Sequence, residues 1–220
     1  MERICEPELM EDPEQAQAYA QADFSQANRL FIELFARYFP EHRPKRALDL
    51  GCGPGEITLH FAQRYPGCLV TGIDGAEAML AFARQNLKRR PELKDRVRFF
   101  KLRLPAKHPC RHYDTILSNS LLHHLHDPKL LWREIQRFGQ AKAAVLVMDL
   151  ERPASPQTAK NLVARYAAQA PEILRRDFFN SLCAAFTLRE IQAQLQEAGL
   201  SDFKVEKVSD RHLAAYGRLH

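Results

Sequence analysis

The feature that most constrains the fold is a glycine-rich turn directly after a short apolar strand. The run from Leu48 to Gly55 reads Leu-Asp-Leu-Gly-Cys-Gly-Pro-Gly, and helical spacing follows it from Glu56 to Tyr65. Side chains at Gly51, Gly53 or Gly55 would obstruct a ligand or forbid the dihedral angles that such a turn requires. The turn therefore predicts a ligand site at the end of this strand.

Strands and helices alternate in the segment around this turn. The expected strands are Ala47–Leu50, Cys68–Ile73, Val97–Leu102, Tyr113–Ser118 and Ala143–Met148, and the later expected helices are Ala76–Arg89 and Pro128–Phe138. This alternation predicts an α/β fold with a doubly wound, mostly parallel sheet. Phe203–Val208 and Leu213–Tyr216, joined by a short turn, predict a terminal hairpin that adds one antiparallel strand.

Two helical segments fall outside the alternation. Residues 13–39 lack glycine and carry apolar residues at helical spacing, and prolines then end the pattern. We expect an N-terminal helical cap over residues 1–44 and a second domain over residues 45–220. Residues 151–186 hold two helical stretches, which predict a helical lid inserted after strand five. A capping box, Thr187 to Glu190, opens the next helix, which ends at Gly199.

Composition limits the setting and the partners. The 32 basic and 27 acidic residues give a modest net charge of +5, which is typical of a solvated basic surface, and an anionic substrate or an RNA is the alternative. No apolar run approaches the roughly 18 residues of a membrane span, and the first residues lack a signal pattern, so a cytosolic protein is expected. Five scattered cysteines without a Cys-x-x-Cys pair predict no disulfide framework. Oligomeric state is not readable from these features.

Two acidic residues narrow the ligand class. Asp74 ends the second strand, where a carboxylate accepts hydrogen bonds from ribose hydroxyls. The loop is Gly-x-Gly-x-Gly, whereas dinucleotide folds use Gly-x-Gly-x-x-Gly. Asp49 stands ahead of the loop, where it suits a ligand with an ammonium group and no pyrophosphate. The sequence therefore favours S-adenosylmethionine over a dinucleotide.

Three segments resemble class I S-adenosylmethionine-dependent methyltransferases: Asp49–Gly55, Gly72–Leu80 and Tyr113–Leu125. The most similar group contains the ubiquinone and menaquinone C-methyltransferases and many small-molecule enzymes, and the resemblance covers about residues 45 to 150. It implies a seven-stranded sheet of order 3-2-1-4-5-7-6 and S-adenosylmethionine as cofactor. It also implies a small-molecule acceptor. A tRNA or rRNA methyltransferase is the alternative, and a scaffold without catalysis is a third hypothesis.

The resemblance also implies a cofactor site. Its residues are Tyr19, Asp49, Gly51, Cys52, Gly53, Gly55, Asp74, Gly75, Met79, Leu102, Arg103, Ser118 and Asn119. The glycine loop would lie under the methionine part, Met79 near the adenine, and Tyr19 over the methionine end. Many relatives carry an Asp before Leu-Pro after strand three, but this chain has Arg103. Adenine recognition would then rest on backbone groups around Leu102 and Arg103.

The end of strand four faces the methyl group in these folds, so we expect Asn119, His123 and His124 to be the catalytic residues. A histidine with an ordinary pKa near 6.5 suits a general base, and simple packing is the alternative. No metal site is predicted, because neither the histidines from His123 to His126 nor the set His108, Cys110 and His112 has a second group of ligands.

Acceptor binding is expected in the lid and the hairpin turn. The candidate residues are Asp149, Arg152, Arg175, Arg176 and Arg211. Converging arginines would hold a carboxylate or phosphate, which predicts an anionic metabolite, and surface charge pairing is the alternative. Strand four ends in Ser-Asn-Ser-Leu, which lacks the Asn-Pro-Pro-Tyr clamp used for planar nitrogens and counts against base methylation.

Overall fold

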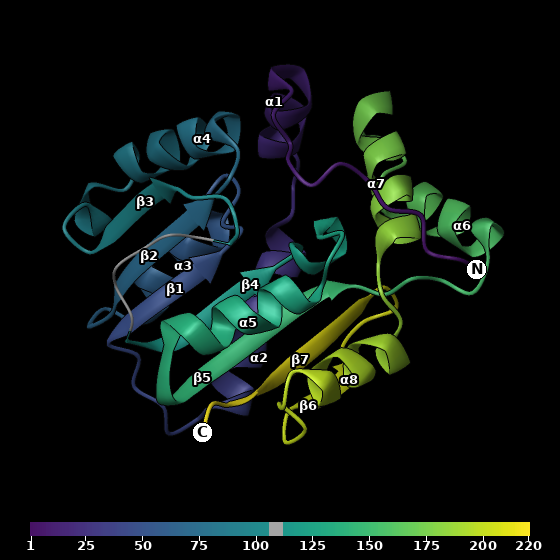
Figure 1. Cartoon of the computed structure of the whole chain (residues 1–220). Coiled ribbons are helices and arrows are strands. Elements are labelled where there is room, and N and C mark those ends of the chain that lie inside the picture. The colour runs from purple at the N-terminus through teal and green to yellow at the C-terminus, as the bar shows by residue number, and fades with distance from the viewer. Residues whose placement is uncertain (106–111) are drawn as a thin grey trace.

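A computed structural model describes residues 1–105 and 112–220 of the chain. Its centre is one seven-stranded sheet of order β3-β2-β1-β4-β5-β7-β6, which confirms the expected order (Figure 1). The strands are β1 Arg46–Leu50, β2 Leu69–Asp74, β3 Val97–Lys101, β4 Tyr113–Asn119, β5 Gly139–Leu150, β6 Lys204–Lys207 and β7 His212–Arg218. β7 runs antiparallel to β5 and β6, while the other pairs are parallel.

The helices are α1 Pro13–Gln21, α2 Ser25–Tyr38, α3 Glu56–Arg64, α4 Glu77–Lys88, α5 Lys129–Phe138, α6 Pro156–Tyr166, α7 Glu172–Ala184 and α8 Leu188–Glu197. Two short 3-10 turns, η1 Pro91–Leu93 and η2 Leu122–His124, complete the elements. The expected capping box of α8 is present, since Thr187 and Glu190 bond each other's backbone N–H groups. Gly199 ends this helix with a φ of +71°.

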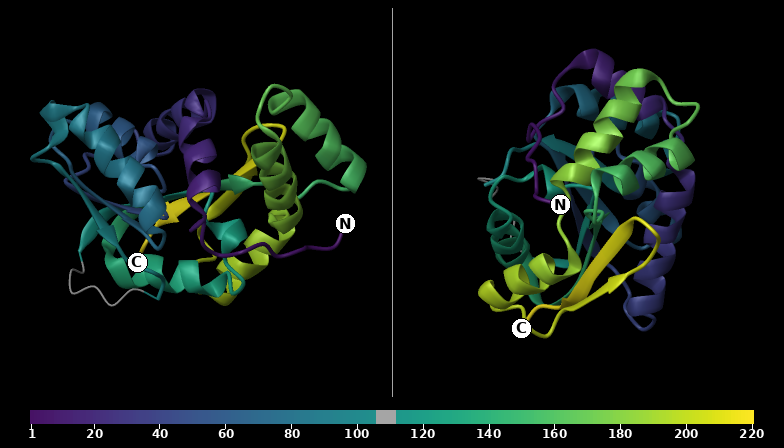
Figure 2. Two further views of the ribbon diagram at one scale, coloured as in Figure 1. Left: turned by 90° about the horizontal axis from the view of Figure 1, so that it is seen from above. Right: turned by 90° about the vertical axis from the view of Figure 1, so that its right-hand side faces the viewer.

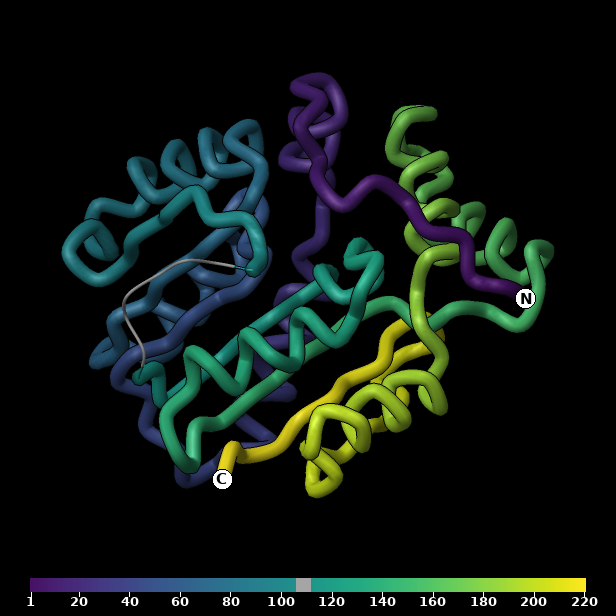
Figure 3. Tube along the Cα trace, viewed as in Figure 1, coloured from purple at the N-terminus to yellow at the C-terminus, as the bar shows by residue number. Residues whose placement is uncertain are grey.

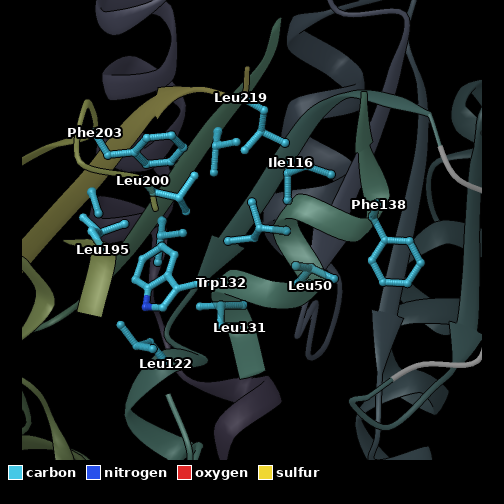
Figure 4. Packing of buried hydrophobic residues seen from close by; sticks show 14 of the residues in the cluster. Leu50, Ile116, Leu122, Leu131, Trp132, Phe138, Leu195, Leu200, Phe203 and Leu219 are labelled. Carbon is cyan, nitrogen blue, oxygen red and sulfur yellow. The ribbon is translucent and has the colours of Figure 1, made fainter. Parts of the chain in front are cut away.

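Each face of the sheet buries its own hydrophobic core. On one face Trp132 and Phe138 of α5 and Leu195 of α8 pack on strand residues such as Ile116 (Figure 4). On the other face the apolar sides of α2 and α3 pack on the alternate residues of the same strands. Because β5 is buried on both faces from residue 143 to 150, its sequence is almost continuously apolar there.

The N-terminal region is helical, as expected, and forms two helices that lie in different places. α2 belongs to the sheet's helical layer, since Phe31, Leu34 and Phe35 share a core with α3. α1 lies beyond the carboxyl ends of the strands, next to α4 and α7 (Figure 2). The division at residue 44 stays a prediction.

The segment 151–186 forms α6 and α7, which pack on each other through a small apolar core around Leu182. Residues 1–12 run from these helices to α1 (Figure 3). Backbone and side-chain bonds hold this N-terminal segment, including Ile4 N–H to the Cys183 carbonyl at 3.1 Å. Within the described ranges no helix is long and apolar enough to cross a membrane.

Candidate active site

A pocket opens at the carboxyl ends of β1, β2 and β4, the edge of a parallel sheet where ligands bind. The residues that line it are Glu8, Leu9, Met10, Tyr19, Phe24, Asn28, Asp49, Gly51, Cys52, Gly53, Pro54, Glu56, Ile57, Ile73, Asp74, Gly75, Ala76, Met79, Leu102, Arg103, Leu104, Asn119, Ser120, Leu121, His124 and Leu125. The structure thus brings together most of the residues expected to bind a cofactor.

The glycine loop forms the floor of this pocket. Gly51 and Gly53 have φ angles of +71° and +51°, the left-handed region that favours glycine. A Cβ at Gly51 would lie 2.8 Å from the Leu121 side chain, whereas a Cβ at Gly53 would meet no atom within 4 Å. The loop therefore leaves open space above Gly53. Gly55 does not line the pocket; it precedes α3 with a φ of +83°.

Asp74 connects the glycine loop to the start of α4. Its Oδ2 accepts a hydrogen bond from the Gly53 N–H, and its Oδ1 accepts one from the Ala76 N–H, both at 2.8 Å. Burial raises the pKa of this carboxyl, although these N–H groups oppose the shift. The carboxylate lies on the pocket wall, at the position expected for a ribose-binding acid.

Asp49 places a second carboxyl in the pocket wall. It is buried, and the Thr58 hydroxyl donates a 2.6 Å hydrogen bond to its Oδ2. Burial raises the pKa of Asp49 to about 7, and the charge of Asp74 adds to the shift. Two nearby acidic groups give the pocket a field that suits a cationic ligand, because a positive charge lowers the cost of ionising them.

Asn119 and Ser118 at the end of β4 have different surroundings. The Oδ1 of Asn119 is buried and has no hydrogen-bond partner among the described residues, and this side chain lines the pocket. Ser118 is fully buried and donates to the Leu50 carbonyl at 3.1 Å, so it does not line the pocket. An unsatisfied buried acceptor costs free energy, and a ligand donor would relieve that cost.

The adjacent histidines also separate. His124 lines the pocket, and burial together with the charge of His123 lowers its pKa to about 3. His123 lies behind it, 2% exposed, with its Nδ1 donating to Asp149. Burial opposes the charged form of His123, but the charges of Asp149 and Glu6 outweigh burial and raise its pKa. His124 is therefore the ring that faces the pocket, and its lowered pKa makes it a weaker base than an ordinary histidine.

The N-terminal segment supplies pocket residues that the sequence did not predict. Glu8, Leu9 and Met10 line the pocket, and Glu8 accepts a 2.9 Å hydrogen bond from Arg103. Leu9 lies against Gly75, because a Cβ added at Gly75 would lie only 2.6 Å from the Leu9 side chain. Residues 1–12 show no helical or strand spacing, so no pattern pointed to this role.

Helices α1 and α2 also contribute to the pocket. Tyr19, expected over the methionine end, lines it and lies 4.7 Å from the ring of Phe24. Burial raises the pKa of Tyr19 to about 12, with added effects from Asp149 and Asp74. Asn28 of α2 is a further polar lining residue that the sequence analysis missed.

The structure does not bring the expected acceptor residues together. Asp149 bonds His123, Arg152 bonds Glu190 at 2.7 Å, and Arg176 lies 3.6 Å from Asp177. The other two lie elsewhere: Arg211 stacks on the Tyr166 ring at 3.5 Å, and Arg175 borders a shallow hollow between α6 and α7. None of the five lines the pocket. Their role in acceptor binding stays a prediction.

The expectation that no metal is bound involved His108 and Cys110, which lie outside the described residues. Within the described part, Glu6, His123 and His124 bring three potential ligand atoms within 4.8 Å of one another.

Comparison with known proteins places the chain among methyltransferases. Residues 48–145 match the family described as "Methyltransferase domain". Trans-aconitate 2-methyltransferase of Delftia acidovorans is 34% identical over 148 residues, which are 67% of this chain and 52% of that protein. The enzyme of the same name from Escherichia coli is 35% identical over 103 residues, 47% of this chain and 38% of its own length. The matched segments thus span about half or less of these curated relatives.

Solved structures share the fold. The plantazolicin methyltransferase BpumL, solved in complex with SAH, superposes with a TM-score of 0.73 at 16% identity and covers 94% of this chain and 90% of its own. A SAM-dependent methyltransferase from Aquifex aeolicus superposes with a TM-score of 0.68 at 18% identity, and the match covers 95% of this chain and 99% of that protein. Sheet order, glycine loop and sequence matches agree. Residues 48–145 thus match a methyltransferase domain, and the chain has the fold of S-adenosylmethionine-dependent methyltransferases.

Proposed function

We propose that this chain transfers a methyl group from S-adenosylmethionine to a small-molecule acceptor. The observation that carries the proposal is the pocket itself. It combines open space above Gly53, acidic groups at Asp49 and Asp74, and the unsatisfied Oδ1 of Asn119. S-adenosylmethionine carries a sulfonium, an ammonium and ribose hydroxyls, which match the negative field and the acceptor atoms of this wall.

The proposed cofactor residues are those expected residues that line the pocket. Asp74 is the acceptor for ribose hydroxyls, Asp49 and Asn119 face the charged methionine end, and Met79 and Leu102 give apolar surface to the adenine. The bound cofactor supplies an activated methyl group. The protein then has to align an acceptor and exclude water, which can lower a barrier by roughly 7–11 kcal/mol.

The names of the relatives support a small organic acid as acceptor. Trans-aconitate 2-methyltransferases are named for a carboxylic acid substrate. No comparison supports the alternative of a tRNA or rRNA acceptor. Asn119, His123 and His124 remain the proposed catalytic residues, with His124 nearest to the pocket. The cytosol remains the proposed compartment.

Two measurements test this function. Calorimetric titration with S-adenosylhomocysteine should show one site, and the Gly53→Val variant should lose it, because valine fills the open space and disfavours a φ of +51°. Labelled S-adenosylmethionine should then label a low-mass, nuclease-resistant product in a metabolite extract. Label in RNA, or no binding by the unaltered chain, would overturn the proposal.

A further inference from the structure

A compact group of side chains lies at the edge of the pocket, outside the proposed cofactor contacts, and of its three members only His124 lines the pocket. Glu6 comes from the N-terminal segment, and His123 and His124 come from η2. Glu6 Oε1 lies 3.4 Å from His123 Nε2 and 3.3 Å from His124 Nδ1. All three side chains are at least four-fifths buried, with exposed fractions of 10%, 2% and 20%.

These separations are those of ligands around one metal ion. An N–H···O hydrogen bond spans about 2.7–3.2 Å, so both contacts are long for a bond to the carboxylate. The Nδ1 of His124 also lies 3.3 Å from the Pro7 carbonyl, a contact that a bound ion would replace. Two ligands on a tetrahedral ion, with bonds of about 2.0–2.2 Å, lie roughly 3.4 Å apart. The distances from the Glu6 carboxylate to the two imidazole nitrogens thus match the distances between ligands of one tetrahedral metal ion.

Neighbouring groups orient the two better-buried ligands. The Nδ1 of His123 donates to the carboxylate of Asp149, so Nε2 is the ring nitrogen on the side of Glu6 and carries the lone pair when the ring is neutral. A carboxylate behind a histidine is the usual outer partner of a metal-binding imidazole. Ser181 of α7 donates to Glu6 at 3.0 Å and holds the carboxylate in place.

We propose that Glu6, His123 and His124 bind one divalent metal ion of the zinc class. Two imidazole nitrogens and one carboxylate oxygen suit Zn²⁺ and similar transition metals rather than Mg²⁺ or Ca²⁺, which prefer oxygen ligands. Three protein ligands leave a fourth coordination position. The ion would also offset the adjacent negative charges of Glu6 and Asp149.

The sequence alone predicted no metal, because the histidine pair had no second ligand nearby in the chain. The structure supplies that ligand from the other end of the fold, through the N-terminal segment. The site goes beyond the proposed function, because none of the three groups is needed as an acceptor for S-adenosylmethionine.

The test is calorimetric titration of chelator-stripped, full-length protein with ZnCl₂, with Co²⁺ absorption as a second readout of tetrahedral geometry. We expect one equivalent to bind. Replacing a residue that only hydrogen-bonds to a metal ligand weakens metal binding about 10–100-fold. Loss of a ligand itself, in Glu6→Gln or His124→Gln, should therefore weaken Zn²⁺ binding at least about 100-fold. His220→Asn, which alters an exposed histidine that pairs with Asp202 rather than with any of the three ligands, should bind as tightly as the unaltered chain.

Circular dichroism establishes that each metal-free variant is folded, and S-adenosylhomocysteine titration is made on Glu6→Gln, whose side chain does not line the pocket. Retained cofactor binding separates this proposal from the proposed function, since either can fail alone. The metal site is refuted if the unaltered protein binds no stoichiometric Zn²⁺, or if folded Glu6→Gln binds it equally well.

Discussion

The hydroxyl of Thr58 donates a 2.6 Å hydrogen bond to the buried carboxyl of Asp49. This contact favours the ionised carboxylate, but burial is the larger effect and raises the pKa of Asp49 to about 7. The Asp49 carboxyl therefore changes its charge near neutral pH. It does so in the pocket wall that is proposed to face the ammonium group of the ligand.

This pKa predicts a pH-dependent cofactor affinity. A ligand cation favours ionised Asp49, so S-adenosylhomocysteine should bind best above pH 7 and lose up to about tenfold in affinity per pH unit below it. Calorimetry between pH 5.5 and 8.5 measures this slope. Asp49→Asn should bind more weakly and with a nearly flat profile. A flat profile for the unaltered chain would contradict the assignment.

Asn119 and Ser118 offer a matched pair of substitutions on β4. Asn119→Ala should weaken S-adenosylhomocysteine binding roughly tenfold or more, because its Oδ1 is proposed to accept a bond from a charged ligand. Its ligand-free stability should not fall, since the substitution removes an unsatisfied acceptor.

Ser118→Ala is the control and should behave in the opposite way. It removes the bond to the Leu50 carbonyl, which should cost about 1 kcal/mol of stability with little effect on affinity. Urea unfolding and ligand titration of both variants measure the two effects. Equal loss of affinity in both would argue against a direct role for Asn119.

The strands, the helices and the glycine loop could be predicted because their signals are local, whereas the sheet order was implied by the family resemblance. Apolar runs alternate with helical spacing, and Gly51, Gly53 and Asp74 occupy fixed offsets around the strand ends. The choice between His123 and His124 could not be predicted. Successive residues of a 3-10 turn point about 120° apart, so the orientation of η2 decides which ring reaches the pocket.

Long-range side-chain partners were equally hidden. Arg152 read as a candidate anion ligand, but a guanidinium pairs with whichever carboxylate the fold brings near, here Glu190, which is 38 residues away in the chain. The N-terminal segment docks through contacts far apart in the chain, such as Arg3 Nε to the Ala184 carbonyl at 2.6 Å. No periodicity in residues 1–12 could reveal them.

Arg3 connects the N-terminal segment to η2 and to the end of α7. Its guanidinium also donates to the carbonyls of His123 and Leu125 at 2.9 and 3.0 Å and lies 4.0 Å from the Phe186 ring centre. Arg3→Ala should release the N-terminal segment, because bonds from charged groups contribute about 1.5–3 kcal/mol each and alanine removes all of them. Amide hydrogen exchange in residues 1–12 should rise by at least tenfold.

The same release should weaken S-adenosylhomocysteine binding, since Glu8, Leu9 and Met10 form one wall of the pocket. Arg3→Lys keeps the charge but presents one compact ammonium instead of a planar fork, so it should restore only part of the protection. Arg133→Ala removes an exposed arginine paired with Asp127 and serves as the control, with no expected change in either measurement. If Arg3→Ala leaves exchange in residues 1–12 unaltered, the segment is held by its other contacts, and Arg3 is not its anchor.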